Sequence, residues 1–158
     1  MELTRAQLEA ILEQALREYP EECCGLLLGP VGAGAEALEV RPCRNIQNEM
    51  HQRDPERYPR TARRAYLLDL QTVQRALRDA REDGRVIRAV YHSHPDEDAY
   101  FSAEDRAAAV PFGDVPSFPE ADYLVVSVRK GEPGELKAFR WDREKRDYGE
   151  VPLRVVEG

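Results

Sequence analysis

A segment that ends in two closely spaced histidines constrains this chain more than any other feature. The apolar run at residues 86–91 leads directly into the sequence His-Ser-His-Pro, and a short apolar run of this kind is typical of a buried strand. Residues i and i+2 of a strand point to the same face. The imidazoles of His92 and His94 are therefore expected to aim at one point.

A polar motif follows this segment at a fixed distance. Ser102 and Asp105 form a Ser-x-x-Asp pattern, and six residues separate it from Pro95. Its ordinary interpretation is a helix N-cap, with Asp105 favourable at the positive end of the helix dipole. The same position would hold a carboxylate rigidly, which suits a metal ligand. A carboxylate delivered to the two histidines could complete three ligands and leave a fourth position open, the layout of a catalytic zinc centre.

Another carboxylate stands at the start of an apolar segment. Residues 23–28 predict a strand buried on both faces, and Glu22 immediately precedes it. Desolvation there could raise the pKa of the carboxyl and suit it to proton transfer, although such glutamates are more often exposed. Cys23 and Cys24 point to opposite faces of a strand, so we expect small buried side chains and no shared metal site. His51, alone in a polar stretch, is left out of the predicted site.

Hydrophobic periodicity places helices and strands around these motifs. A capping box at Thr4 begins a helix that Pro20 ends, Asp69 caps a helix that stops at Gly84, and another helix runs from Ala103 to about residue 110. Strands are predicted at residues 23–28, 37–43, 64–68, 86–94, 122–128, 135–141 and, at an edge, 148–156. Irregular loops are expected at residues 45–61 and 111–120, and a turn at residues 131–134.

Length and charge limit the classes of protein to consider. A chain of 158 residues has the length of one domain with a real core. The net charge of −7 argues against nucleic acid as the main partner. We expect no membrane segment, because no apolar run approaches the roughly 18 residues required, and the first residues do not resemble a signal peptide. Three cysteines without a small secreted framework favour the reducing cytoplasm.

Taken together, these motifs resemble a known family. The order of His-Ser-His-Pro, six residues, Ser, two residues and Asp, with a Glu upstream of an apolar strand, is similar to the JAMM motif of the JAMM/MPN (JAB1/MPN/Mov34) metallopeptidases. Residues 20–29 are similar to the first strand of that family. The resemblance covers roughly residues 4–141, and every motif position is filled, unlike in the inactive scaffold members.

The resemblance implies a fold and a role for each motif residue. The fold would be one α/β domain over residues 1–158, a mixed curved sheet flanked by helices in a three-layer, cytidine-deaminase-like arrangement. His92, His94 and Asp105 would bind Zn²⁺, with a water in the fourth position. Glu22 would be the general base, preferred to its neighbour because it stands two residues before Cys24-Gly25. Ser102 would donate a hydrogen bond to the developing oxyanion.

The resemblance also suggests a substrate class. The segments that flank the motif are short, as in compact bacterial JAB-domain proteins that process ubiquitin-like, β-grasp sulfur carriers with a Gly-Gly tail. In one branch the enzyme releases cysteine from the carrier's C-terminus during cysteine biosynthesis. The tail would add as a strand at a sheet edge, and the loops at residues 45–61 and 111–120 are candidate walls of its groove.

Several alternatives remain open at this point. The site could belong to a general deubiquitinase-like isopeptidase, or to a protein-interaction module with a structural zinc ion, although such a module needs neither Glu22 nor Ser102. An amidohydrolase also uses His-x-His, but its barrel needs about 250 residues. A zinc deaminase is excluded, because it requires His-x-Glu and a later cysteine pair, whereas His94 stands at the second position here and no such pair follows. An iron oxygenase is chemically possible, but the position of Ser102 gives it no support.

Overall fold

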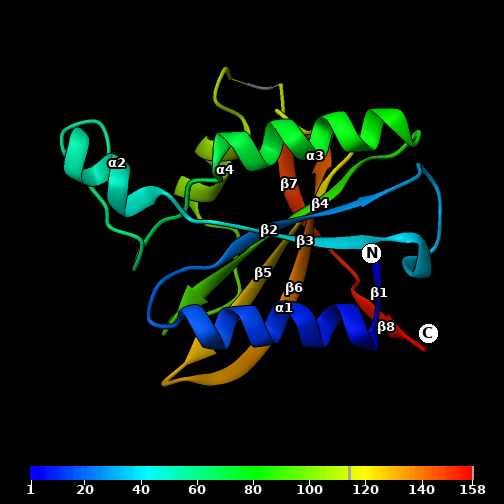
Figure 1. Cartoon of the computed structure of the whole chain (residues 1–158), viewed down its shortest axis with the longest axis horizontal. Helices are drawn as coiled ribbons and strands as arrows, with labels where there is room; N and C mark the ends of the chain where they lie inside the picture. The colour runs from blue at the N-terminus through cyan, green and yellow to red at the C-terminus, as the bar shows by residue number, and fades with distance from the viewer. Residues whose placement is uncertain (114, 158) are drawn as a thin grey trace.

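The computed structural model describes residues 1–113 and 115–157, and within them the main feature is a six-stranded mixed sheet (Figure 1). Asp114 of the predicted 111–120 loop and Gly158 lie outside the described residues. The strand order is β3-β2-β4-β5-β6-β7, with β4 and β5 parallel and the other neighbours antiparallel. The bounds are β2 Cys24–Gly29, β3 Glu39–Cys43, β4 Val86–Pro95, β5 Asp122–Arg129, β6 Glu132–Asp142 and β7 Asp147–Val151.

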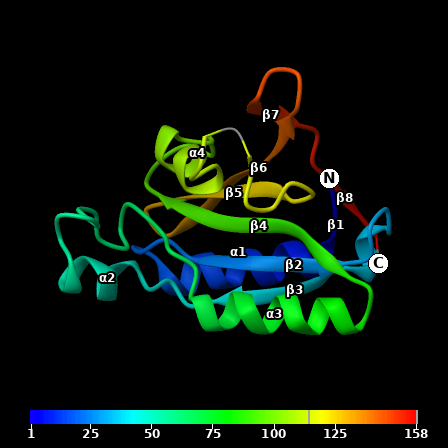
Figure 2. The same cartoon turned by 90° about the horizontal axis from the view of Figure 1, so that it is seen from above.

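Helices cover both faces of this sheet and give three layers (Figures 1 and 2). α1, Arg5–Glu18, packs through Ile11 and Ala15 on one face. α3, Leu70–Glu82, and α4, Ala103–Ala109, lie on the other and pack through Ala76 and Ala109. The side chains of β2 alternate between the two cores, with Leu26 and Leu28 in one and Leu27 in the other, as the period of two residues requires. The predicted α/β fold class is confirmed.

The first helix begins and ends where its sequence predicts. The Thr4 hydroxyl accepts from the backbone N–H of Gln7 at 3.2 Å, and the Gln7 side chain accepts from the N–H of Thr4 at 2.8 Å, which completes the capping box. Further along α1, the buried Gln14 donates to the Cys24 carbonyl and accepts from the Tyr91 hydroxyl. These bonds hold the helix against β2 and β4.

The end of the chain differs from the single edge strand predicted at residues 148–156. β7 ends at Val151, Pro152 interrupts the strand, and β8, Arg154–Val156, leaves the sheet to pair in parallel with β1, Glu2–Thr4. Proline has no backbone N–H to donate to a ladder, so the break falls at this position. The two ends of the chain therefore lie close together (Figure 1).

Four other local predictions are also wrong. The stretch at 45–61 contains a helix, α2, Gln47–Arg53, while residues 64–68 form no strand and make one bridge, between Asn45 and Leu68. Lys130 and Gly131 have φ values of 51° and 76° and make the β5–β6 turn, so β6 begins at Glu132, within the predicted turn. A 3₁₀-helix at Ala35–Ala37 delays the start of β3 to Glu39.

None of the helices in the described residues is long and apolar enough to cross a membrane.

Candidate metal centre

The end of β4 and the first turn of α4 bring three potential metal ligands together. The Nε2 atoms of His92 and His94 lie 3.2 Å apart, and each lies within 3.2 Å of one carboxylate oxygen of Asp105, at 3.1 and 3.2 Å. All three side chains are buried. Tetrahedral bonds of about 2.0–2.1 Å place neighbouring ligand atoms about 3.3 Å apart. These residues can therefore hold a metal ion, and both donor type and spacing fit Zn²⁺.

Hydrogen bonds orient two of these ligands. The Nδ1 atom of His94 lies 2.9 Å from the backbone carbonyl of Asp98, and since a carbonyl only accepts, Nδ1 carries the proton and Nε2 keeps its lone pair. The Asp105 N–H donates to the Ser102 hydroxyl at 3.0 Å, and the Ser102 N–H donates to the Asp105 carboxylate at 3.1 Å. The predicted N-cap therefore exists and fixes the carboxylate.

The ionisation of Asp105 and His92 suits metal binding. Burial opposes ionisation of Asp105, but attraction and hydrogen bonds from the two imidazoles outweigh it and hold the pKa of that carboxyl well below its ordinary value. Burial lowers the pKa of His92, whose ring stacks on Tyr66 with centroids 4.4 Å apart. At His94, burial acts in the same direction, but the hydrogen bond and charge of Asp105 raise the pKa. A carboxylate and a neutral His92 are forms that a metal requires.

A cavity of about 240 Å³ lies in front of the cluster and receives the other predicted site residues. Glu22, His94, Ser102 and Asp105 line it, while the fully buried His92 is not part of the lining and lies against His94. The Ser102 hydroxyl accepts a backbone N–H and keeps its own hydrogen to donate. Of the two predicted loop walls, residues 45–61 contribute Arg60, and the described part of 111–120 contributes none of the lining.

Glu22 is a buried carboxyl with an unusual proton affinity. Its side chain is 6% exposed, and desolvation, reinforced by the charge of Asp105, raises its pKa to about 8 against the opposing attraction of His94. Its Oε1 atom is buried and has no hydrogen-bond partner among the described residues. An unpartnered buried oxygen beside three potential metal ligands is placed to accept a proton from a molecule that enters the cavity.

The backbone of Glu22 is fixed on both sides. Its N–H donates to the Ala62 carbonyl at 2.8 Å, and its own carbonyl accepts from the Asn45 amide at 2.9 Å. The next residue, Cys23, exchanges two hydrogen bonds with Ser93, which stands between the two histidines. Sequence reasoning missed Asn45 and Ala62, because their role depends on contacts that span about twenty or more positions along the chain.

We expect Asn45→Ala to destabilise the fold by about 2–4 kcal/mol. The Asn45 side chain donates to the carbonyls of Glu22 and Ala65 and accepts from the amides of Gln47 and Leu67. Its removal leaves four backbone groups to find other partners. Urea denaturation measures the change, with the exposed Gln52→Ala on the same segment as the control. Equal midpoints for the two variants would contradict this role.

Glu22→Gln is expected to make the folding stability of the chelator-treated protein depend less on pH. The folded-state pKa of about 8 lies above the ordinary value of 4.5, so the folded wild type binds more protons than the unfolded chain between these values. The stabilisation that this group contributes is therefore complete below about pH 4.5 and is lost as pH rises to about 8, a change of about 3–5 kcal/mol. Urea denaturation at pH 5 and pH 9 should show this loss in wild type but not in the variant. Parallel pH profiles would contradict it.

Comparison with known proteins identifies the family. The sequence profile described as prokaryotic homologues of the JAB domain matches residues 4–142. A protein named CysO-cysteine peptidase in Mycobacterium tuberculosis is 34% identical over 148 residues, which cover 94% of this chain and 86% of that protein.

Solved structures support the same family assignment. One from Desulfitobacterium hafniense has a TM-score of 0.71 and 27% identity and covers 99% of this chain and 93% of that one. A JAB1/MPN domain protein from Archaeoglobus fulgidus shares the fold, with a TM-score of 0.55, 21% identity and coverage of 99% and 100%. The resemblance to JAB1/MPN proteins is thereby confirmed, and this chain belongs to the family of prokaryotic homologues of the JAB domain.

Proposed function

We propose that this protein is a zinc-dependent peptidase that cleaves after the C-terminal glycine of a ubiquitin-like, β-grasp sulfur carrier. One observation carries the chemistry: a buried carboxyl with a raised pKa shares a cavity with a cluster of two histidines and an aspartate. The name of the mycobacterial relative supports the substrate class and cysteine as the leaving group. The free thiols of Cys23, Cys24 and Cys43 suit a reducing cytoplasm.

Each site residue has a distinct task in this proposal. His92, His94 and Asp105 hold the ion, and the Asp98 carbonyl and the Ser102 cap keep the ligand atoms in place. Zn²⁺ held there would polarise the scissile carbonyl and lower the pKa of the attacking water to about 7. Glu22 accepts a proton from that water and returns it to the leaving amine.

Ser102 is assigned to the oxyanion. Because its oxygen already accepts the Asp105 N–H, its hydroxyl hydrogen is directed to another acceptor, and the carbonyl oxygen of a substrate in the cavity can take it. A single donor of this kind is worth about 3 kcal/mol to the transition state. We therefore expect Ser102→Ala to lower kcat by about 100-fold, measured with a β-grasp carrier that has one cysteine after its Gly-Gly tail. An unchanged kcat would remove Ser102 from the mechanism.

A defined carrier tests the function. The substrate is a β-grasp sulfur-carrier protein with one cysteine after its Gly-Gly tail, and intact mass spectrometry reports the product. The zinc-loaded protein should remove the mass of one cysteine residue, and a chelated sample and Glu22→Gln should not. A protein that binds one zinc ion per chain yet cleaves neither this carrier nor a lysine-linked one would fit a protein-interaction module and contradict the proposal.

A further inference from the structure

Two arginines stand on the wall of an otherwise acidic cavity. Arg60 and Arg64 line the same cavity as Glu22 and Asp105. Two further carboxylates, Glu97 and Glu104, complete its charged lining. In a chain with a net charge of −7, this gives the cavity a cationic side that could meet an anionic group on a substrate.

The two arginines are held at a fixed place relative to the site. They flank a turn in which the Arg64 N–H donates to the Thr61 carbonyl at 3.1 Å. The middle of this turn contacts the site directly, because the Ala62 carbonyl accepts the N–H of Glu22. The Arg60 carbonyl accepts from the buried side chain of Gln47 at 2.9 Å. The turn whose Ala62 carbonyl holds the N–H of Glu22 therefore also carries the backbone of both arginines, which separate hydrogen bonds hold in place.

The present partners of these arginines are weak competitors. Arg60 donates to Glu104 at 2.8 Å and to the Arg64 carbonyl at 3.4 Å, and Arg64 lies 3.8 Å from Glu97. The side chains of Arg60 and Arg64 are 40% and 69% exposed, and those of Glu104 and Glu97 are 55% and 45% exposed. Ion pairs this exposed contribute about 0–1 kcal/mol. A guanidinium offers five donors in a fork that suits carboxylates, so Arg60 can bind an entering carboxylate beside or in place of Glu104.

We propose that Arg60, assisted by Arg64, binds the free α-carboxylate of the group that leaves, which makes this enzyme a carboxypeptidase acting on carrier tails. The inference rests on the function proposed above and narrows it. Water adds to the glycine carbonyl, the C–N bond breaks, and the nitrogen takes the proton, so the products are a carrier ending in glycine and a free amino acid. In that amino acid the carboxylate lies two bonds from the scissile nitrogen. A lysine side chain as leaving group has no carboxylate at this position.

The test compares two carriers that differ in one group. Both end in Gly-Gly-Cys, one with a free C-terminal carboxylate and the other with a C-terminal amide, and kcat/KM is measured for each. We expect the zinc-loaded wild type to prefer the acid by about 10- to 100-fold, the usual range for hydrogen bonds to a charged group. Arg60→Gln should bring the ratio of acid to amide close to one, and Arg60→Lys should restore part of it.

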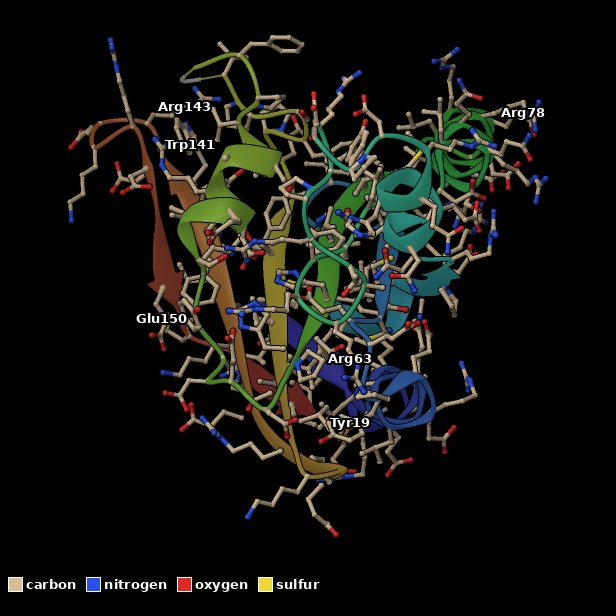
Figure 3. The ribbon with its side chains drawn as sticks, turned by 90° about the vertical axis from the view of Figure 1, so that its left-hand side faces the viewer. Tyr19, Arg63, Arg78, Trp141, Arg143 and Glu150 are labelled. Carbon is tan, nitrogen blue, oxygen red and sulfur yellow. The ribbon has the colours of Figure 1, made fainter. Side chains whose placement is uncertain are left out.

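Two control variants separate binding from support of the loop. Glu104→Gln removes the same ion pair but leaves the arginine, so it should keep or increase the preference for the acid. Arg63→Gln removes a charge from the same turn, but Arg63 lies beside Tyr19 at the end of α1 (Figure 3) and does not line the cavity. It should keep the preference. If Arg60→Gln and Glu104→Gln each lowered kcat/KM equally for the acid and the amide carrier, Arg60 would only support the loop. That result would overturn the inference.

Binding gives an answer that does not depend on turnover. In the zinc-loaded Glu22→Gln variant, calorimetry should show about 10- to 100-fold tighter binding of the acid carrier than of the amide. The double variant Glu22→Gln/Arg60→Gln should bind the acid carrier and the amide carrier with equal affinity. Equal affinities in the parent variant would overturn the carboxylate site. Absence of cleavage of both carriers by the wild type would instead contradict the proposed function, whatever the binding data show.

Discussion

Replacing Glu22 with glutamine is expected to lower kcat by about 100- to 10,000-fold, the range that general acid–base catalysis contributes. Glutamine keeps the size of the side chain but cannot take a proton from water or return it to the leaving amine. The three ligand side chains are untouched, so the bound metal should remain at wild-type level. The measurement combines kcat on the cysteine-terminated carrier with metal content by elemental analysis.

The neighbouring residue provides a matched control for this substitution. The Glu21 side chain is exposed and accepts a hydrogen bond from Asn48 at 2.8 Å, outside the cavity lining. Glu21→Gln removes the same charge one position away and should keep kcat within about twofold of wild type, as expected for a surface change. A larger loss in Glu21→Gln than in Glu22→Gln would show that the base has been assigned to the wrong glutamate.

Asp105→Asn is expected to weaken metal binding by at least about 100-fold. Groups that only orient a ligand are worth about 10- to 100-fold in affinity, and this change removes the negative charge of a ligand itself. Asparagine keeps the oxygen that accepts the Ser102 N–H, so α4 should remain capped and the fold intact. Competition with a chromophoric chelator measures the affinity, and circular dichroism reports the fold.

Glu104→Gln is the control for this change in charge. Glu104 stands one residue earlier in the same helix turn, is exposed, and contacts Arg60 rather than the histidines. The metal affinity of the Glu104→Gln variant should stay within about twofold of wild type, because the charge that is removed lies near the surface and is screened. If Asp105→Asn bound the metal as tightly as this control, the site would not use Asp105.

The parts of the site that could be predicted depend on short patterns along the chain. The alternation of a strand brings His92 and His94 to one face, and the N-cap pattern fixes Asp105 through Ser102. Strong local signals of this kind also located α1, α3 and the central strands. The prediction that α4 meets the end of β4 depended on the family resemblance, because no local pattern encodes the distance between these two elements.

The parts that could not be predicted depend on long-range contacts of polar residues. The sequence places Asn45 and Gln47 in a predicted irregular polar stretch. In the structure, their side chains form hydrogen bonds with the backbone carbonyls of Glu22 and Arg60. α2 has no apolar face that would mark it as a helix, and the residue it buries is Gln47. β1 is three residues long and exists through its pairing with β8 from the other end of the chain. Such features leave no periodic signal.

One metal ion at His92, His94 and Asp105 is expected to make this protein a peptidase, and stepwise restoration of the metal tests this expectation. The chelated protein is titrated with Zn²⁺ while release of cysteine from the carrier is followed. We expect activity to rise from near zero, to saturate at one zinc ion per chain, and not to appear in Asp105→Asn over the same range. Full activity of the chelated protein, or the same saturation curve in Asp105→Asn, would contradict it.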